Sequence, residues 1–392
     1  MPQQIIYLDH AAATPMDPRV RAAMAPFETE LFFNPSSPYA PAVSVRSAYE
    51  QARADLAHAI GGKPADIIIT AGATESINLA FTCLDNPDGT PSDAHVITTA
   101  IEHASVLASA KAHDHTLVGV TPTGRVLPAE IEAAIKPTTR LISVGLANNE
   151  LGTIQPIRTI AEIVRAERLR RLQAGDATPL FLHCDASQGA GQTNINISSL
   201  GVDMLTCNAG KIYGPKQVGL LWAQPDVVLH ALVHGGGQER NLRSGTENVA
   251  GAVGFARALT LAVENRKFEA ERLQVLRDGL QRYLTREFPQ AVVSGHKKHR
   301  LPGHLHISFP GIDAERIVFL LEEKNVLVGT GAACAANKDT RSHVLEAIGM
   351  DPQLADGSLR LTLGHLSTRE NTVVAAQLIS AAIHSEYERM AR

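Results

Sequence analysis

Short apolar runs alternate with helix-forming segments along the first 245 residues, and this alternation most constrains how the chain can fold. The apolar runs are continuous, which is typical of strands buried on both faces, as in a parallel sheet covered by helices. The expected strands are 66–70, 95–99, 117–122, 140–147, 180–185, 204–207 and 218–223. The expected helices are 42–60, 74–84, 104–113, 127–136 and 157–173. The pattern predicts an α/β fold on a mostly parallel, seven-stranded sheet.

The pattern changes after about residue 245, where the helices become longer and the strands shorter. In order, we expect helices at 246–264 and 266–287, strands at 291–295 and 304–309, a helix at 314–324, a strand at 358–364 and a last helix from about 367. This order predicts a smaller α+β domain at the C-terminal end. The chain has 392 residues, more than one hydrophobic core usually holds. We therefore expect a large domain over 15–260 and a small domain made of 1–14 and 261–392.

Charge and cysteine content exclude several classes of protein. The formal net charge is −4, without a long run of one sign, so we expect neither nucleic acid nor a membrane surface as a partner. The start "MPQQIIYLDH" does not read as a signal peptide, and no apolar run is long enough to span a bilayer. The four cysteines form no CxxC pair, which argues against a structural zinc site or a disulfide framework and favours a reducing cytoplasm.

Polar side chains follow the ends of several expected strands, which is where ligands bind in parallel sheets. Thr74 opens a helix after the first strand, and a hydroxyl beside free helix N–H groups suits either a phosphate site or a plain N-cap. His103 follows the second strand, where a structural or a functional histidine would fit. Asn149 follows the fourth strand and suits either a turn or a donor aimed into a cleft.

Asp185 and Lys211 follow the next two strands. A carboxylate at the end of a buried strand should face a cation, although a metal site or an ordinary strand-end acid would also explain Asp185. Lys211 lies in "CNAGKIYGPKQVG", a glycine-rich turn between two apolar strands, and a surface lysine needs no such setting. One ligand uses a helix N-terminus, a hydroxyl, an imidazole, a carboxylate and an amine together. That ligand is pyridoxal 5'-phosphate, whose aldehyde reacts with an amine and whose ring nitrogen needs an acid.

With these motifs in order, the chain resembles the fold-type I pyridoxal-phosphate enzymes of the class V aminotransferase-like group. Within that group it is similar to the cysteine desulfurases that supply sulfur for iron–sulfur clusters. The resemblance covers nearly the whole chain and rests on "YLDHAAATPM", "NPSS", "AGATESIN", "EHASVL", "NNELGTIQP", "DASQ", "GKIYGPK", "HGGGQERNLRSGTENV", "GTGAAC" and "LRLTLG".

The resemblance implies roles for the residues around the cofactor ring. Lys211 would form the Schiff base and later move the Cα proton, and Asp185 would pair with the pyridine nitrogen. His103 would stack on the ring and take part in proton transfer. Gln188 would hydrogen-bond the ring hydroxyl, with Asn149 near that hydroxyl and the substrate carboxylate.

The resemblance also implies how the phosphate is held and which residues the partner supplies. Thr74 and the backbone around Ala73 would contact the phosphate. Thr246 would reach the phosphate bound by the other subunit, which implies a homodimer with a shared active site. The family usually has Ser-x-His immediately before the lysine, whereas this chain has Asn208 and Gly210 there. Asn208 can still donate a hydrogen bond, but Gly210 offers only its backbone. Phosphate binding is therefore expected to be weaker or differently arranged.

Two further residues would act on the substrate. Arg360 resembles the arginine that clamps the substrate carboxylate, a task that suits a bidentate fork. Cys334 resembles the catalytic cysteine and lies in "VGTGAACAANKD", a run of small residues typical of a mobile loop. Lys338 nearby would help to lower the pKa of its thiol. A buried small hydrophobic role, the usual one for a free cysteine, fits the other three cysteines better.

The implied reaction converts L-cysteine to L-alanine and leaves a persulfide on Cys334. The sulfur would then pass to an iron–sulfur scaffold or another acceptor protein, for cluster assembly or for tRNA thiolation. One alternative keeps the cofactor and changes the reaction to that of an aminotransferase or of a selenocysteine or cysteine sulfinate lyase. A second alternative is a non-catalytic scaffold on the same fold.

Overall fold

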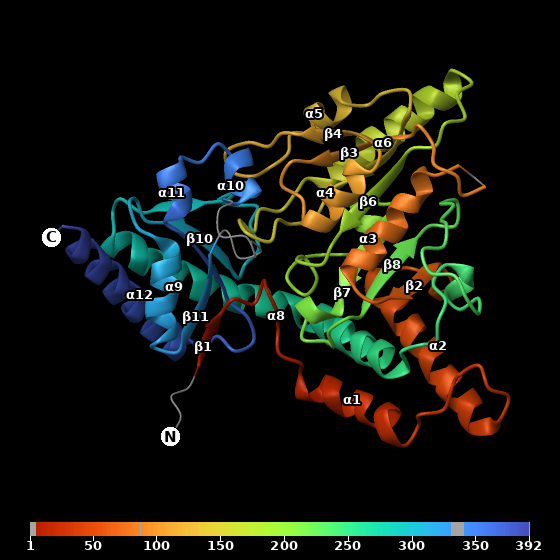
Figure 1. The fold of residues 1–392 in the computed structure, drawn as a ribbon, viewed down its shortest axis with the longest axis horizontal. Helices are drawn as coiled ribbons and strands as arrows, with labels where there is room; N and C mark the ends of the chain where they lie inside the picture. The colour runs from red at the N-terminus through yellow and green to blue at the C-terminus, as the bar shows by residue number, and fades with distance from the viewer. Residues whose placement is uncertain (1–4, 87, 331–340, 392) are drawn as a thin grey trace.

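The computed structural model describes residues 5–86, 88–330 and 341–391, which form two sheets (Figure 1). The larger sheet has seven strands in the order β2-β8-β7-β6-β5-β3-β4, and the smaller has five in the order β1-β11-β12-β10-β9. In Figure 1 the larger sheet lies on the right and the smaller on the left, joined beneath by the long helix α8. Among the described residues, no helix is both long and apolar enough to cross a bilayer.

The larger sheet is mostly parallel, as predicted. Its strands are β2 (Ile67–Thr70), β3 (His95–Thr99), β4 (Asp114–Val118), β5 (Thr139–Ser143), β6 (Phe181–Asp185), β7 (Met204–Asn208) and β8 (Gly219–Ala223). Only β8 runs antiparallel to its neighbours, β2 and β7. Strands β2 to β7 therefore all point their carboxyl ends at the same edge of the sheet.

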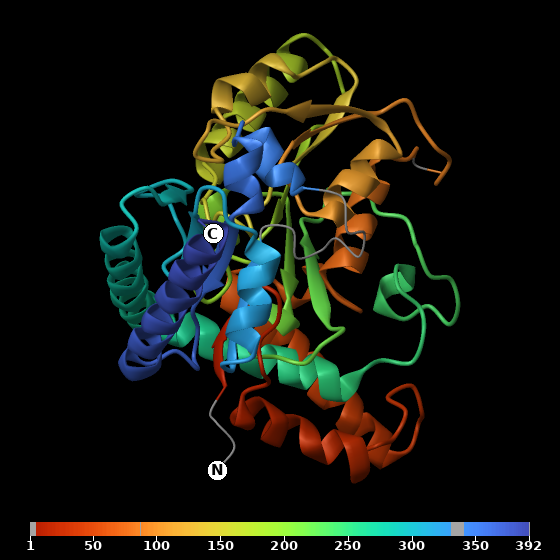
Figure 2. The same ribbon diagram turned by 60° about the vertical axis from the view of Figure 1, so that its left-hand side comes forward.

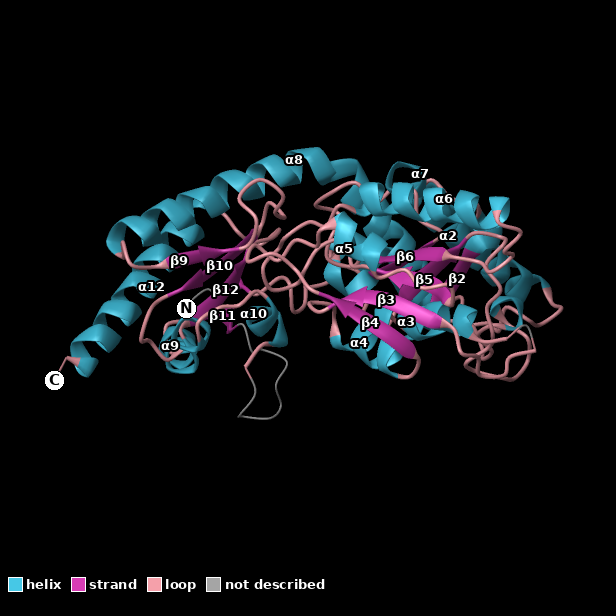
Figure 3. Ribbon diagram, turned by 90° about the horizontal axis from the view of Figure 1, so that it is seen from above, coloured by secondary structure: helices cyan, strands magenta, loops and turns pink. Residues whose placement is uncertain are grey.

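Helices cover both faces of the larger sheet, which explains its continuous apolar strands. Ile67 and Ile69 of β2 pack into the core shared with α2 and α8, whereas Ile68 between them packs into the core shared with α3. Figure 3 shows α3 and α4 on one side of this sheet and α6, α7 and α8 on the other. The helices of this part are α1 (Pro18–Thr29), α2 (Ala40–Ile60), α3 (Ala73–Phe81), α4 (Ala104–Lys111), α5 (Pro128–Ala133), α6 (Ile157–Gln173), α7 (Ile197–Leu200) and α8 (Val249–Glu287).

The smaller sheet is apolar on one face and polar on the other. Its strands are β1 (Ile6–Leu8), β9 (Val292–Ser294), β10 (His304–Ser308), β11 (Val326–Thr330) and β12 (Ser358–Thr362). Leu359 and Leu361 of β12 join a core with α8, α9 (Ala314–Glu322) and α12 (Arg369–Met390), and Figure 2 shows α9 and α12 side by side. Arg360 between them is buried on the opposite face. Two short helices, α10 (His343–Ala347) and α11 (Pro352–Asp356), precede β12.

Two sequence-based expectations were wrong. The helices expected at 246–264 and 266–287 are one helix, α8. It has no glycine or proline in its middle. Its middle lies between the two cores and packs into neither, so the polar residues there do not end the helix. The strand expected at 117–122 is β4, Asp114–Val118. As an edge strand paired only with β3, it carries a weak apolar signal. The proposed domain boundary at residue 260 falls inside α8, and the division into two domains stays a prediction.

We expect Glu264→Pro to lower the free energy of unfolding by about 3 kcal/mol or more, because proline breaks a helix interior. Glu264 is exposed in the middle of α8, so no packing change accompanies the backbone effect. Chemical denaturation measures the change, and Glu264→Ala is the control, expected within about 0.5 kcal/mol of the unchanged protein. Equal stability of the two variants would show that α8 is not continuous in solution.

Candidate active site

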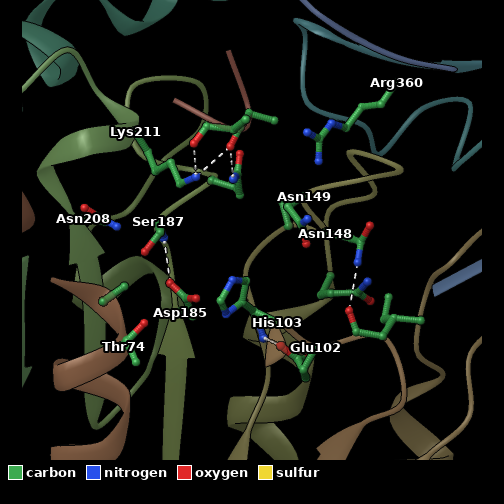
Figure 4. A pocket seen from close by; sticks show the side chains of 18 residues that line it. Thr74, Glu102, His103, Asn148, Asn149, Asp185, Ser187, Asn208, Lys211 and Arg360 are labelled. Atoms are coloured by element: carbon green, nitrogen blue, oxygen red, sulfur yellow. Dashed lines mark hydrogen bonds between the residues drawn. The ribbon is translucent and has the colours of Figure 1, made fainter. Parts of the chain in front are cut away.

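A pocket of about 280 Å³ opens at the carboxyl ends of strands β2 to β7 (Figure 4). Its lining includes Ala73 and Thr74 after β2, Glu102 and His103 after β3, Asn148 and Asn149 after β5, Asp185, Ser187 and Gln188 after β6, Asn208 and Lys211 after β7, and Arg360 from the smaller sheet. The pocket therefore lies where the two sheets meet, and it gathers most of the residues that the sequence predicted.

Helix α3 begins at one end of the pocket with an open N-terminus. Gly72 precedes it at φ 129°, ψ 175°, a conformation that favours glycine, and supplies no side-chain cap. Gly219 lies against it so closely that a Cβ there would be 2.6 Å from the Gly72 carbonyl carbon. The N–H groups of the first turn of α3, with the positive end of the helix dipole and the Thr74 hydroxyl, form a site for an anion such as a phosphate.

Asp185 ends β6 on the floor of the pocket. Its Oδ1 accepts a hydrogen bond of 2.9 Å from the Ser187 N–H, which fixes the carboxylate. The Ser187 hydroxyl is buried with no hydrogen-bond partner in the described ranges. Gln188, just beyond, donates from Nε2 to the carbonyl of Ala11 at 3.1 Å. This corner offers a carboxylate, a hydroxyl and an amide to whatever fills the pocket.

His103 caps helix α4 and points its ring into the pocket (Figure 4). Its Nδ1 accepts from the Ser105 N–H at 3.2 Å and lies 2.7 Å from the Ser105 hydroxyl. Burial lowers the pKa of His103 against the opposing influence of Asp185, and the nearby Lys211 lowers it further. The ring is therefore neutral near pH 7, with Nδ1 as acceptor and the proton on Nε2, the nitrogen not used by the cap.

Glu102, next to His103, is a buried acid that sequence reasoning did not select. Its carboxylate accepts from the Thr99 hydroxyl at 2.7 Å and from the Gly145 N–H at 3.0 Å. Burial raises its pKa to about 7, and Asp185 adds to the rise. The signal in the sequence was a glutamate three residues after an apolar strand, similar to the strand-end acid that identified Asp185.

Lys211 points into the pocket rather than to solvent. It ends a single 3-10 turn, Ala209–Lys211, that follows β7. Its Nζ donates to the carbonyls of Ala11 at 2.8 Å and Ala12 at 2.7 Å. The N–terminal segment therefore holds the amine within the pocket, on the same side as Asp185 and Asn208 in Figure 4.

The two positions where the chain departs from the usual Ser-x-His lie beside Lys211. Asn208 lines the pocket and accepts from the Gly210 N–H through Oδ1 at 3.1 Å, which leaves its amide N–H groups for a ligand. A Cβ on Gly210 would lie 3.3 Å from Cδ of Lys216, so the Lys216 side chain fills part of the space beside it.

The neighbouring asparagines have different tasks. Asn148 donates to the carbonyl of Ile101 at 2.9 Å and accepts from two backbone N–H groups, so its role is to shape the turn. Asn149 lines the pocket on the side nearest Arg360 (Figure 4). Arg360 enters from β12 and forms an ion pair with Asp9, whose Oδ1 lies 2.8 Å from Nη2.

One predicted residue lines a different hollow, and two others fall outside the described residues. Thr246 lies in a separate hollow together with Tyr49, Arg243 and Asn248. Cys334 and its neighbour Lys338 lie outside the described residues. The motif "YLDHAAATPM" contains Asp9, Ala11 and Ala12, but no role was assigned to them, because two of the three act through backbone carbonyls.

The donor set fits pyridoxal phosphate. The lining brings together an anion site at the start of α3, the Asp185 carboxylate, the Lys211 amine and the His103 imidazole. Each matches a group of the cofactor: the phosphate, the ring nitrogen, the aldehyde and the ring face. In the described part of the chain, no cluster of three or more histidine, cysteine or acidic side chains could hold a metal ion.

Known proteins share this architecture. The family described as Aminotransferase class-V matches residues 6–373. The cysteine desulfurase IscS of Dictyoglomus turgidum is 39% identical over 371 residues, 93% of this chain and 91% of that protein. Cysteine desulfurase IscS 1 of Archaeoglobus fulgidus is 38% identical over 93% of each chain.

Solved structures agree with these relatives. A structure titled as a NifS-like protein superposes with a TM-score of 0.88 at 33% identity, covering 97% of this chain and all of that one. A structure of SspA in complex with cysteine gives a TM-score of 0.77 at 30% identity, covering 91% of this chain and 98% of that one. The predicted family and fold are thus confirmed.

We expect Glu102→Gln to change how stability depends on pH. The folded pKa of about 7 lies above the ordinary 4.5, so the contribution of Glu102 to stability is complete below pH 4.5 and is lost as the pH rises through 7. Glutamine imitates the protonated acid and does not ionise. The free energy of unfolding of the variant, relative to that of the unchanged protein, should therefore rise by up to about 3 kcal/mol between pH 5 and pH 8. Denaturant unfolding at both values measures this. The exposed Glu162→Gln should show no such gain, and a constant difference for Glu102→Gln would contradict the prediction.

Proposed function

Because the chain belongs to the aminotransferase class-V family and is a pyridoxal-phosphate-dependent cysteine desulfurase, we propose that it works through a persulfide on Cys334. The observation that carries this proposal is the meeting of Lys211, Asp185, His103 and Arg360 around one pocket. The balanced reaction joins the sulfur of L-cysteine to the Cys334 thiol and releases L-alanine. The carbon–sulfur bond of cysteine breaks, a sulfur–sulfur bond forms, and the thiol proton ends on the products.

The cofactor, when bound, supplies an electron-withdrawing ring that makes the Cα–H bond of cysteine acidic. We assign its phosphate to the N-terminus of α3 at Ala73 and Thr74, and its ring nitrogen to the Asp185 carboxylate. His103 would cover the ring and Gln188 would bind the ring hydroxyl. The placing of these residues around one pocket supports the assignments, which the family resemblance suggests.

Asn208 takes over part of the phosphate binding that serine and histidine provide in the family. Its amide N–H groups supply donors, and Gly210 adds none from a side chain. The phosphate would then be held mainly by Asn208 and the N-terminus of α3, in a weaker or different arrangement from the usual one.

Lys211 and His103 are the groups that move protons. We assign Lys211 Nζ the removal of the Cα proton of the substrate and its return. In the structure the carbonyls of Ala11 and Ala12 accept from this nitrogen and keep it at the pocket. His103, with its proton on the nitrogen not used by the helix cap, is placed to donate to the substrate or to a reacting intermediate.

Arg360 and Asn149 orient the substrate. The Arg360 guanidinium has five N–H donors in a planar fork, and a carboxylate accepts two of them side by side. Asn149, on the same side of the pocket, adds an amide. L-Cysteine held in this way presents its Cα to Lys211 and its sulfur to the Cys334 thiolate.

The surroundings of the reaction are also part of the proposal. The enzyme acts as a homodimer in which Thr246 of the partner subunit completes the phosphate site. It passes the persulfide sulfur to an iron–sulfur scaffold or another acceptor protein, for cluster assembly or tRNA thiolation. A reducing cytoplasm suits the chain, since Cys83, Cys184 and Cys207 are buried free thiols.

We expect Cys334→Ala to abolish sulfur transfer. After treatment with L-cysteine, mass spectrometry of the intact protein should find one added sulfur atom on the unchanged enzyme and none on the variant. Cys83→Ala is the control, because it removes a buried thiol to which the proposal gives no role. This variant should still show the one added sulfur atom. Undiminished sulfide release by Cys334→Ala would reject the persulfide mechanism and favour a lyase or an aminotransferase.

We expect active hybrid dimers from two inactive variants. Lys211→Ala lacks the amine and Thr246→Ala lacks the proposed contact across the dimer. A hybrid of the two contains one site with both Lys211 and Thr246 of the partner subunit, so refolding the mixture should restore up to half of the activity per hybrid. No recovery, with hybrids present in native mass spectra, would mean that Thr246 serves its own subunit.

A further inference from the structure

We propose that Asp9 is a positioning residue for the substrate carboxylate, because it holds the guanidinium of Arg360 at the pocket, and that Gly329 leaves the space this pair needs. The inference rests on the proposed role of Arg360 and deepens it. It concerns the N-terminal segment, to which the sequence motifs assigned no task.

The ion pair is largely shielded from water. Asp9 Oδ1 lies 2.8 Å from Nη2 of Arg360, and the two side chains are 19% and 5% exposed. A largely shielded, charged hydrogen bond fixes geometry better than an exposed ion pair, which solvent and salt screen. Asp9 therefore limits the positions that the Arg360 side chain can take.

The pair leaves donors for a ligand. Asp9 engages Nη2, and Nε of Arg360 is buried with no hydrogen-bond partner in the described part of the chain. The fork has five N–H groups, so several stay available beside the bond to Asp9. A second carboxylate can bind the guanidinium edge that faces the pocket, which Arg360 lines.

The pairing follows from strand periodicity. Ile6 and Leu8 of β1 join the apolar core, as do Val326 and Val328 of β11. Residues between and directly after these positions point to the opposite face, since side chains alternate along a strand. Asp9 and Gly329 thus share the polar face with Arg360, and backbone pairing brings them together.

The register places the three residues side by side. Gly329 is opposite Arg360 in the β11–β12 ladder, and Asp9 forms an isolated bridge with Thr362, two residues beyond Arg360. A Cβ on Gly329 would lie 2.9 Å from Asp9 Oδ1 and 3.0 Å from Arg360 Nη2. These distances are shorter than ordinary contacts of a carbon atom, so a side chain at position 329 forces the end of the Asp9 or the Arg360 side chain to shift.

The same segment also holds the catalytic lysine. Asp9 binds Arg360, while the carbonyls of Ala11 and Ala12, two and three residues later, accept from Lys211. The Tyr7 hydroxyl donates to the carbonyls of Asp9 and Ala13 at 2.8 Å each and so fixes the path between them. One short stretch of backbone therefore sets the distance between the carboxylate-binding group and the proton-transfer group.

The test compares two ligands of the holoenzyme that differ only in the carboxylate. L-Alanine carries it and ethylamine does not. We expect Asp9→Asn and Gly329→Ala each to raise the Kd of L-alanine about tenfold, the size expected for one lost charged hydrogen bond, and to leave the Kd of ethylamine unchanged. Isothermal titration calorimetry measures both. In turnover, KM for L-cysteine should rise by a similar factor with kcat changed about twofold at most.

Matched controls separate positioning from general damage. Asp356 forms an exposed ion pair with Arg341 and lies shortly before β12, the strand that carries Arg360. Asp356→Asn removes this acid and should change neither Kd. Gly279→Ala adds a methyl group where no atom lies within 4 Å, and should also be neutral. Loss of affinity for both ligands in Asp9→Asn, or a lower Kd for L-alanine, would overturn the proposal.

Arg360→Gln distinguishes failure of this inference from failure of the proposed function. If Arg360→Gln leaves the Kd of L-alanine unchanged, the substrate role of Arg360 is wrong. If it raises that Kd while Asp9→Asn and Gly329→Ala do not, only the role of Asp9 is wrong. The double variant of Asp9→Asn and Arg360→Gln should be no weaker than Arg360→Gln alone, because Asp9 acts through that arginine.

Discussion

Burial of the seven-stranded sheet on both faces is the constraint on which the rest of the structure depends. Apolar side chains such as Ile67 and Ile68 fill cores on opposite sides, so neither face of the sheet has room for a polar ligand. Polar chemistry is confined to the edge where the strands end. The side chains of Asp185, His103 and Lys211 converge there because parallel strands bring residues distant in sequence to one line.

The smaller sheet follows the opposite rule, and the difference completes the site. Its strands alternate apolar and polar residues, which buries one face against α8, α9 and α12 and turns the other toward the pocket. Arg360 lies on that polar face and lines the pocket, where it forms an ion pair with Asp9. In the proposed function the two sheets therefore have different roles: the larger one would bind the cofactor, and Arg360 of the smaller one would bind the substrate carboxylate.

Residue patterns predicted the elements whose apolar residues are buried in the structure and whose ends are marked by polar turns. Strands such as β3 and β6 were placed to within a residue, because they are buried on both faces and bounded by polar turns. The edge strand β4 was misplaced, since Leu117 is half exposed and the apolar pattern continues past the strand. Several pocket residues at strand ends, such as Asp185 and Lys211, were also predicted, whereas Glu102 was not.

Contacts made through the backbone or across long distances were not found. The carbonyls of Ala11 and Ala12 carry no side-chain signal, so nothing in the residues pointed to their bonds with Lys211. Asp9 and Gly329 depend on the pairing of three strands that are far apart in the chain. A buried acid such as Glu102 resembles an ordinary strand-end residue until its surroundings are known.

The position of β1 also determines when the site can form during protein synthesis. Ile6 to Leu8 leave the ribosome first, yet their partner β11 is Val326–Thr330, and Arg360 comes later still. The larger sheet can assemble while the chain grows, whereas the first strand must wait, unpaired, for nearly the whole polypeptide. A chain that ends before β12 cannot form the site, because the N-terminal segment contacts both Lys211 and Arg360 only after β1 has joined β11 and β12.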